Sequence, residues 1–170
     1  RRVVRYLTGA GLTRGGAVSA RTRPIRVLIV CTHNAARSLM AEALLRWMGG
    51  DAVDVHSAGT EPAQVHPLTV RVLEEISVDA SGLRAKSVEE FRGQAFDSVI
   101  TVCDQARERC PYVPSGEQIH WSFPDPSAVE GSEEERLEAF RQVRDAIAQR
   151  LRLWLSVTLR DPKHRSLPQW

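Results

Sequence analysis

The chain has 170 residues, three of them cysteine, with 42% hydrophobic and 26% charged residues, which is ordinary for a globular protein. No apolar run approaches the roughly 20 residues needed to cross a bilayer, so the composition excludes a membrane-spanning chain. The formal charge of +2 hides an asymmetry, since residues 1–24 carry six arginines and no acid, which leaves −4 for residues 25–170.

The arginine-rich start, residues 1–24, is a pattern shared by transit peptides, nucleic-acid-binding arms and disordered extensions. We expect a disordered extension, because the segment has almost no periodic apolar pattern. Residues 25–160 are then expected to form a single catalytic domain, followed by a frayed tail at residues 161–170. The negative charge of the body gives no reason to expect nucleic acid as a partner, and without a long apolar run we expect no membrane either.

Three cysteines without a secretory signal argue against a disulfide scaffold and favour a cytoplasmic protein with reduced thiols. Such cysteines are catalytic, bind a metal or are simply buried.

Strands and helices alternate along the body. Residues 25–30 are short, β-branched and apolar, which is typical of a buried parallel strand. A helix over residues 35–48 follows, with Leu39, Ala43 and Trp47 on its apolar stripe and Gly49-Gly50 at its end. The remaining predicted elements are a strand at 53–56, helices at 67–76 and 87–91, strands at 98–102 and 118–121, and an amphipathic helix at 132–157. This order predicts an α/β fold, a four-stranded parallel sheet with helices on both faces.

The loop between the first strand and the first helix has the features of an anion site. Ligands of open α/β sheets bind where strands end and helices begin, because unpaired N–H groups and the helix dipole favour negative charge there. A loop that curls from Cys31 to Arg37 can wrap its amides around a tetrahedral oxyanion. The predicted oxyanion-binding residues are Thr32, His33, Asn34, Ala35, Ala36 and Arg37.

Within this loop, Arg37 offers a planar fork that stays charged, and the same positive field stabilises a thiolate at Cys31. Ser38 can donate a hydrogen bond to that sulfur. Asn34 can brace the loop or accept an unusual backbone angle. His33 either lines the mouth of the pocket or faces solvent, and the sequence leaves this open.

Cysteine-to-arginine spacing alone is weak support, because Cys103 also has an arginine six residues later, Arg109. Asp104 and Glu108 lie inside that second match and would repel an oxyanion. The loop at Cys31 contains no acid, so we interpret it as the nucleophile loop and the second match as unrelated to anion binding.

The run V-L-I-V-C-T-H-N-A-A-R-S-L-M-A-E-A-L resembles the opening of the low-molecular-weight tyrosine phosphatase fold, and specifically its thioredoxin-coupled arsenate reductases. Further similar segments are S-A-G at 57–59, V-H-P at 65–67, F-D-S-V-I-T-V-C-D at 96–104, C-P at 110–111, H-W-S-F-P-D-P at 120–126 and F-R-Q-V-R-D at 140–145. The resemblance covers about residues 25–155. It implies that arsenate is the substrate, that thioredoxin is the reductant, and that the activity serves arsenic detoxification.

The resemblance also implies that Asp125 is the general acid. Without it, Asp125-Pro126 is equally well explained as a turn. A carboxyl that is protonated near neutral pH needs partial burial or a negative neighbour, so we expect one of these around Asp125.

Cys103 and Cys110 favour reduction over hydrolysis, because a phosphatase of this fold needs only one cysteine. The resemblance implies a cascade in which Cys103 attacks Cys31 and Cys110 then attacks Cys103. In a continuous helix their Cα atoms would lie about 10.5 Å apart, whereas a disulfide requires roughly 4.4–6.8 Å. We therefore expect residues 104–114 to rearrange on oxidation.

No cofactor and no metal are expected, since Cys103, Cys110 and His120 lack the paired spacing of zinc sites. Some similar proteins bind potassium through positions resembling Asn34, Glu42, Ser57 and an acid. Lys86 stands where that acid would fall, so we expect no potassium dependence. His66 and His120 are expected to be structural.

Three alternatives stay open. A tyrosine phosphatase would share the loop, but phosphatases of this fold usually carry an aromatic after the Asp-Pro pair, where this chain has Ser127. A non-catalytic oxyanion-binding or redox-sensing protein would not need Asp125. A glutaredoxin or a low-molecular-weight thiol could replace thioredoxin as reductant.

Overall fold

Four parallel strands form the centre of the computed structural model, which describes residues 23–161. They stand side by side in the order β2-β1-β3-β4. The central position of β1 explains its sequence: residues 27–30 are fully buried, because both faces of this strand are covered. Edge strand β4 alternates half-buried and exposed positions instead. The strands are β1 (Ile25–Cys31), β2 (Val53–Gly59), β3 (Phe96–Thr101) and β4 (Ser115–His120).

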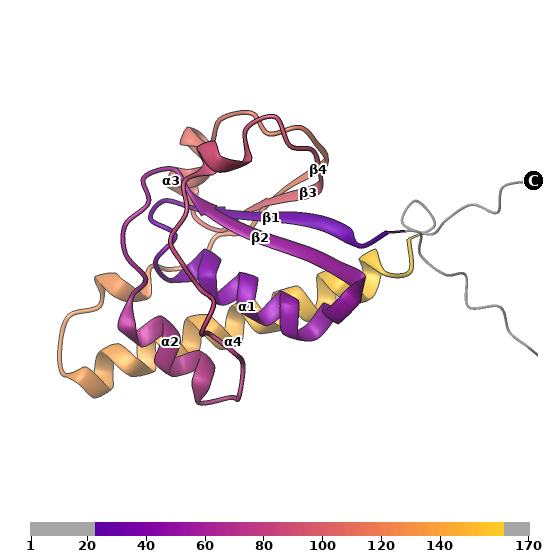
Figure 1. Ribbon diagram of the computed structural model, residues 1–170. Coiled ribbons are helices and arrows are strands. Elements are labelled where there is room, and N and C mark those ends of the chain that lie inside the picture. The colour runs from indigo at the N-terminus through magenta and orange to yellow at the C-terminus, as the bar shows by residue number, and fades with distance from the viewer. Residues whose placement is uncertain (1–22, 162–170) are drawn as a thin grey trace, which may run out of the picture.

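Helices lie on both faces of the sheet, and the predicted fold class is confirmed. In Figure 1, α1, α2 and α4 lie below the sheet, and α3 lies above it. The long helix α4 begins with a complete capping box, in which Ser132 and Glu135 bond each other's backbone N–H groups. The helices are α1 (Arg37–Gly49), α2 (Pro67–Glu74), α3 (Asp104–Arg109) and α4 (Glu133–Thr158), with short 3-10 turns η1 (Gly50–Ala52), η2 (Val88–Phe91) and η3 (Pro126–Ala128).

Two apolar residues near the ends of predicted helices are exposed. Trp47 is 59% exposed. The N-terminal part of α1 is buried on all sides from Ser38 to Leu45, between the sheet and α4, and Trp47 lies beyond that cover. Ile76 is also exposed, because α2 ends at Glu74 and Ser77 then turns with a φ of 59°. The 3.6-residue pattern predicted correctly where helices form, but it did not predict where each helix ends or stops being covered.

The division of the chain into extension, domain and tail stays a prediction. Residues 1–22 and 162–170 lie outside the described residues. Of the predicted extension, Arg23 is described, and its guanidinium pairs with Asp97 at 2.7 Å. Between residues 23 and 161, no helix is long and apolar enough to cross a membrane.

Candidate active site

Cys31 is the last residue of β1, and the loop that follows it leads into α1. Next to β1 stands β3, and the backbone N–H of Val102 donates to the carbonyl of Val30 at 2.9 Å. The two neighbouring parallel strands therefore end side by side, which brings the segment that carries Cys103 next to the loop that carries Cys31. The Thr32 hydroxyl lies 3.3 Å from the sulfur of Cys103.

The carbonyl groups of the nucleophile loop (residues 31–38) point outward, to the segment that follows β2. Residues 31, 32, 33 and 35 each accept a backbone hydrogen bond, from Thr60, Glu61, Ala63 and His66 at 2.8–3.2 Å. A peptide whose carbonyl faces outward turns its N–H the other way, toward the centre of the loop. The N–H of Asn34 shows this directly, because it donates to the Cys31 sulfur at 3.2 Å. Such a ring of amides is suited to a tetrahedral anion.

Gly59 allows the end of β2 to lie close against the nucleophile loop. A Cβ at this position would lie 2.7 Å from the carbonyl oxygen of Thr32 and 3.0 Å from the backbone N of Asn34. Only glycine can therefore end β2 without pushing the nucleophile loop away, which gives the S-A-G segment a physical role.

Two groups are directed at the sulfur of Cys31, which is 3% exposed. Besides the N–H of Asn34, the hydroxyl oxygen of Ser38 lies 2.9 Å from it. The Asn34 side chain donates to that same hydroxyl at 2.7 Å, which leaves the Ser38 proton free to point at the sulfur. Both groups can donate a hydrogen bond to a thiolate at this position, the reactive form of cysteine.

Asn34 holds the loop in both of the ways considered from the sequence. Its φ is 48°, in the left-handed region that asparagine tolerates better than most residues. Its side chain donates to Ser38 and Ser57 and accepts from the backbone N–H of Lys86. All these contacts are buried, so the loop is braced from behind before any anion binds.

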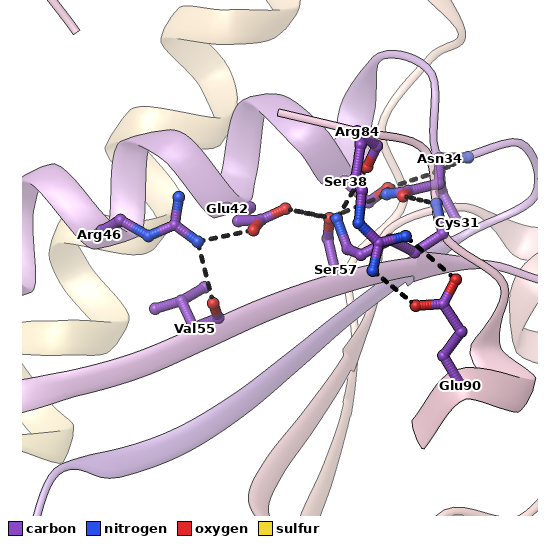
Figure 2. A network of polar contacts seen from close by, with 10 residues as sticks. Cys31, Asn34, Ser38, Glu42, Arg46, Val55, Ser57, Arg84 and Glu90 are labelled. Atoms are coloured by element: carbon purple, nitrogen blue, oxygen red, sulfur yellow. Dashed lines mark hydrogen bonds and ion pairs between the residues drawn. The ribbon is translucent and has the colours of Figure 1, made fainter. Parts of the chain in front are cut away.

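Behind Asn34 the polar network ends in a buried carboxylate (Figure 2). Glu42 accepts a hydrogen bond from Ser57 and pairs with Arg46 at 2.6 Å. The ammonium of Lys86 lies 3.2 Å from Glu42, and both of these side chains are less than 10% exposed. Lys86 also donates to the carbonyl of Arg84 at 2.8 Å. The ammonium of Lys86 therefore supplies the positive charge that pairs with the buried carboxylate of Glu42.

The N-terminus of α1 is left open to an anion. Its N-cap residue, Ala36, makes no side-chain hydrogen bond, and its first turn contains no acid, whereas α4 has a capping box and three glutamates there. The side chain of Arg37, 12% exposed, donates to the carbonyl of Phe123 at 3.0 Å. Its other terminal nitrogen lies 3.7 Å from the Asp125 carboxylate.

Asp125 lies beside the nucleophile loop, but its surroundings differ from those expected of a protonated acid. Partial burial acts to raise the pKa of Asp125, yet the hydrogen bonds from Ser127 and the charges of Arg37 and His33 together lower it. The expected partial burial of Asp125 is therefore present, but the hydrogen bonds and positive charges outweigh it, and the net effect is a lowered pKa. A bound oxyanion would itself be the negative neighbour that raises this pKa.

The three histidines discussed from the sequence have separate roles. His33 is exposed, and its Nδ1 donates to the backbone carbonyl of Glu61 at 3.1 Å. His66 is the N-cap of α2, where its Nδ1 accepts from Leu68, and burial lowers the pKa of His66. His120 bonds Thr101 through one nitrogen and Asp104 through the other.

Cys103 and Cys110 stand at the two ends of α3, as its N-cap and C-cap residues. Cys103 is 4% exposed, whereas Cys110 is half-buried, and burial raises the pKa of Cys110. The Cys110 N–H still completes the helix by donating to Ala106 at 2.8 Å. All three cysteines are free thiols. A disulfide between the two ends requires α3 to unwind.

The sequence did not reveal several contacts of this site. Glu61 pairs with Arg109, the residue that we had set aside as the end of an unrelated match. Their separation of 48 residues leaves no periodic signal in the sequence. Within the described part of the chain, no group of three or more His, Cys, Asp or Glu side chains could hold a metal ion.

Comparison with known proteins gives one consistent result. The family model of the low molecular weight phosphotyrosine protein phosphatases matches residues 26–164. An arsenate reductase of Halalkalibacterium halodurans is 39% identical over 127 residues, which is 74% of this chain and 91% of that protein.

Solved structures are similar as well. An arsenate reductase in a phosphate-binding state has a TM-score of 0.66 at 28% identity, over 78% of this chain and 98% of that one. A thioredoxin-dependent arsenate reductase of Corynebacterium glutamicum has a TM-score of 0.63 at 31% identity, over 84% of this chain and 66% of that one.

Proposed function

Since the chain belongs to the low molecular weight phosphotyrosine protein phosphatase family, we propose that its oxyanion loop serves the reduction of arsenate to arsenite. The observation that carries this proposal is the contact of Thr32 with Cys103, which brings a second thiol to the edge of the nucleophile loop. A phosphate ester hydrolase has no use for that thiol. A reductase requires it, because two electrons must leave sulfur for arsenic.

In the first step the Cys31 thiolate attacks arsenic, and one arsenate oxygen leaves as water. The amides of residues 32–37 and the guanidinium of Arg37 hold the oxyanion. Asp125 gives the proton to the leaving oxygen, since the bound anion raises its pKa above that of the free protein. The product is a thiol–arsenate adduct on Cys31.

In the second step the Cys103 thiolate attacks the sulfur of Cys31. The electron pair of the S–As bond goes to arsenic, so arsenite leaves as As(III) and a Cys31–Cys103 disulfide forms. The hydroxyl of Thr32 can donate to a Cys103 thiolate, because it already lies within reach of that sulfur. Cys110 then attacks Cys103 and frees Cys31, which leaves a Cys103–Cys110 disulfide.

Reduced thioredoxin is the proposed electron donor. Support comes from the paired thiols at the ends of α3 and from the thioredoxin-dependent relative. Thioredoxin would take up the oxidation from Cys103–Cys110 and return all three cysteines to thiols. The disulfide would be accessible to such a partner, since only Ala106 of α3 is buried and unwinding would carry the disulfide to the surface.

The test is arsenate-dependent NADPH oxidation in the presence of thioredoxin and thioredoxin reductase. Wild type should turn over, and Cys31→Ser, Cys103→Ser and Cys110→Ser should each lose turnover by about 10³-fold or more. Normal turnover in Cys103→Ser and Cys110→Ser would contradict the cascade. Hydrolysis of a phenyl phosphate that needs Cys31 alone, without arsenate turnover, would favour the phosphatase alternative instead.

A further inference from the structure

Glu61 connects the C-terminal end of α3 to the nucleophile loop, whose Thr32 contacts the N-terminal end of the helix at Cys103 and Gln105. The Glu61 carboxylate pairs with Arg109 at 2.6 Å, one residue before Cys110. Its backbone N–H donates to the carbonyl of Thr32 at 2.8 Å, and its carbonyl accepts from the ring of His33. Glu61 thus contacts two residues of the nucleophile loop and the last residue of α3.

Very little else holds α3 in place. Ala106 is the only buried residue among its six. At the other end of the helix, Asp104 bonds His120 and Ser122. A cavity of about 420 Å³ lies beside the C-terminal end, lined by residues that include Arg107, Cys110 and Val113. A short helix with one buried side chain and loose packing opens easily, so exposed ion pairs matter more here than in a packed helix.

The proposed cascade requires this helix to open. The sulfur of Cys110 must reach Cys103, which stands at the opposite end of α3. The Asp104 contacts lie next to Cys103 and can persist during such a movement. The Arg109 contact lies next to Cys110 and must break.

We propose that Glu61 and Arg109 form a latch, here called the Glu61 latch, that keeps Cys110 away from Cys103 while α3 is folded. The proposal rests on the proposed function. In the step that the latch controls, Cys110 loses its proton to solvent and forms a bond with Cys103, while the Cys31–Cys103 bond breaks and Cys31 leaves as a thiolate. No external oxidant or reductant takes part. Arg109 and Glu61 are positioning residues, since neither touches the reacting sulfurs.

The size of the expected effect follows from exposure. Both side chains of the latch are more than half exposed, and such a pair shifts an equilibrium by only about twofold to fivefold. A weak contact suits a latch that opens once in every turnover. Glu61→Gln and Arg109→Gln should each raise the open population of α3 by this factor.

Opening can be measured without arsenate by hydrogen exchange of the full-length reduced protein. The backbone N–H groups of Arg107 and Cys110 report on α3, because they donate to Cys103 and Ala106 inside the helix. Both should exchange about twofold to fivefold faster in Glu61→Gln and Arg109→Gln. The charge-swapped double variant, Glu61→Arg with Arg109→Glu, should return toward the wild-type rate. Arg107→Gln, on the same helix but without contact to Glu61, is the matched control and should stay at that rate.

The second measurement follows the thiols themselves. In a Cys31→Ser background, the dithiol oxidant diamide takes two electrons and two protons from Cys103 and Cys110, and their disulfide is quantified by alkylation and mass spectrometry. Glu61→Gln and Arg109→Gln should form it about twofold to fivefold faster than the Arg107→Gln control. Equal rates of disulfide formation in all variants would contradict the latch. Hydrogen exchange in the charge-swapped double variant that is as fast as in the single variants would contradict it as well. Because neither measurement uses arsenate, a failed latch and a failed reductase remain distinguishable.

Discussion

The nucleophile loop and α3 begin in the same way and are held in opposite ways. Each has a cysteine at its start, Cys31 or Cys103, and an arginine six residues later, and each follows a strand at the same edge of the sheet. The loop is fixed by buried hydrogen bonds of its carbonyls and by the Asn34 network. By contrast, α3 is held by an exposed ion pair at one end and the Asp104–His120 hydrogen bond at the other, with one buried alanine between them. The same spacing therefore gives a rigid anion site in one place and a segment that can open in the other.

The largest expected difference between the two regions concerns their arginines. Arg37→Lys should lower kcat/KM for arsenate by about 10²- to 10³-fold, because an ammonium cannot replace the fork that contacts Phe123 and faces the anion. Arg107→Lys on α3 should change it less than about twofold. The measurement is kcat/KM for arsenate in both variants at one pH. A loss in Arg37→Lys as small as that in Arg107→Lys would contradict the distinction between the two regions.

Stability should differ in the same direction. Glu42→Gln should lower the free energy of unfolding by about 3 kcal/mol, because it leaves the buried ammonium of Lys86 without its carboxylate. Asp104→Asn, the same change at the exposed end of α3, should leave the midpoint of urea unfolding where it is in wild type. Equal losses in the two variants would show that α3 is as firmly held as the loop.

A smaller effect concerns the acid beside the loop. The hydrogen bond from the Ser127 hydroxyl is one of the contacts that lower the pKa of Asp125, so Ser127→Ala should raise that pKa. A protonated acid then persists to higher pH, and the limb on which kcat falls with rising pH should move upward, by less than about one pH unit. Ser122→Ala, which removes a hydroxyl from Asp104 instead, should leave the limb in place. If the high-pH limb of the kcat profile stays at the wild-type position in Ser127→Ala, the result would argue against Asp125 as the acid.

The smallest expected effect is that of potassium. Because Lys86 already places a positive charge on Glu42, replacing sodium by potassium at equal ionic strength should leave the arsenate turnover rate unchanged. A clear rise of the rate with potassium would mean that the network behind Asn34 is not complete without an added ion.

The fold and the centre of the site could be predicted because their signals are local. Runs of β-branched residues predict the buried strands. The segment from Cys31 to Arg37 contains no acid and lies between a strand and a helix, which predicts the anion site. The ends of the elements were less accurate, and Trp47 was expected to be buried although it lies beyond the covered part of α1. Contacts such as Glu61 with Arg109 depend on where two distant segments meet, and the sequence holds no pattern for that. The charge state of Asp125 likewise depends on partners that only the fold brings together.

The outward-facing carbonyls of the nucleophile loop have a consequence for selectivity. Since those carbonyls are held by hydrogen bonds within the chain, the shape of the ring of amides does not depend on which tetrahedral anion it binds. Phosphate and arsenate have the same charge and the same tetrahedral geometry, so abundant phosphate should compete with arsenate for this binding site. Discrimination must then come after binding, from the readiness of pentavalent arsenic to take electrons from sulfur, which phosphorus does not share.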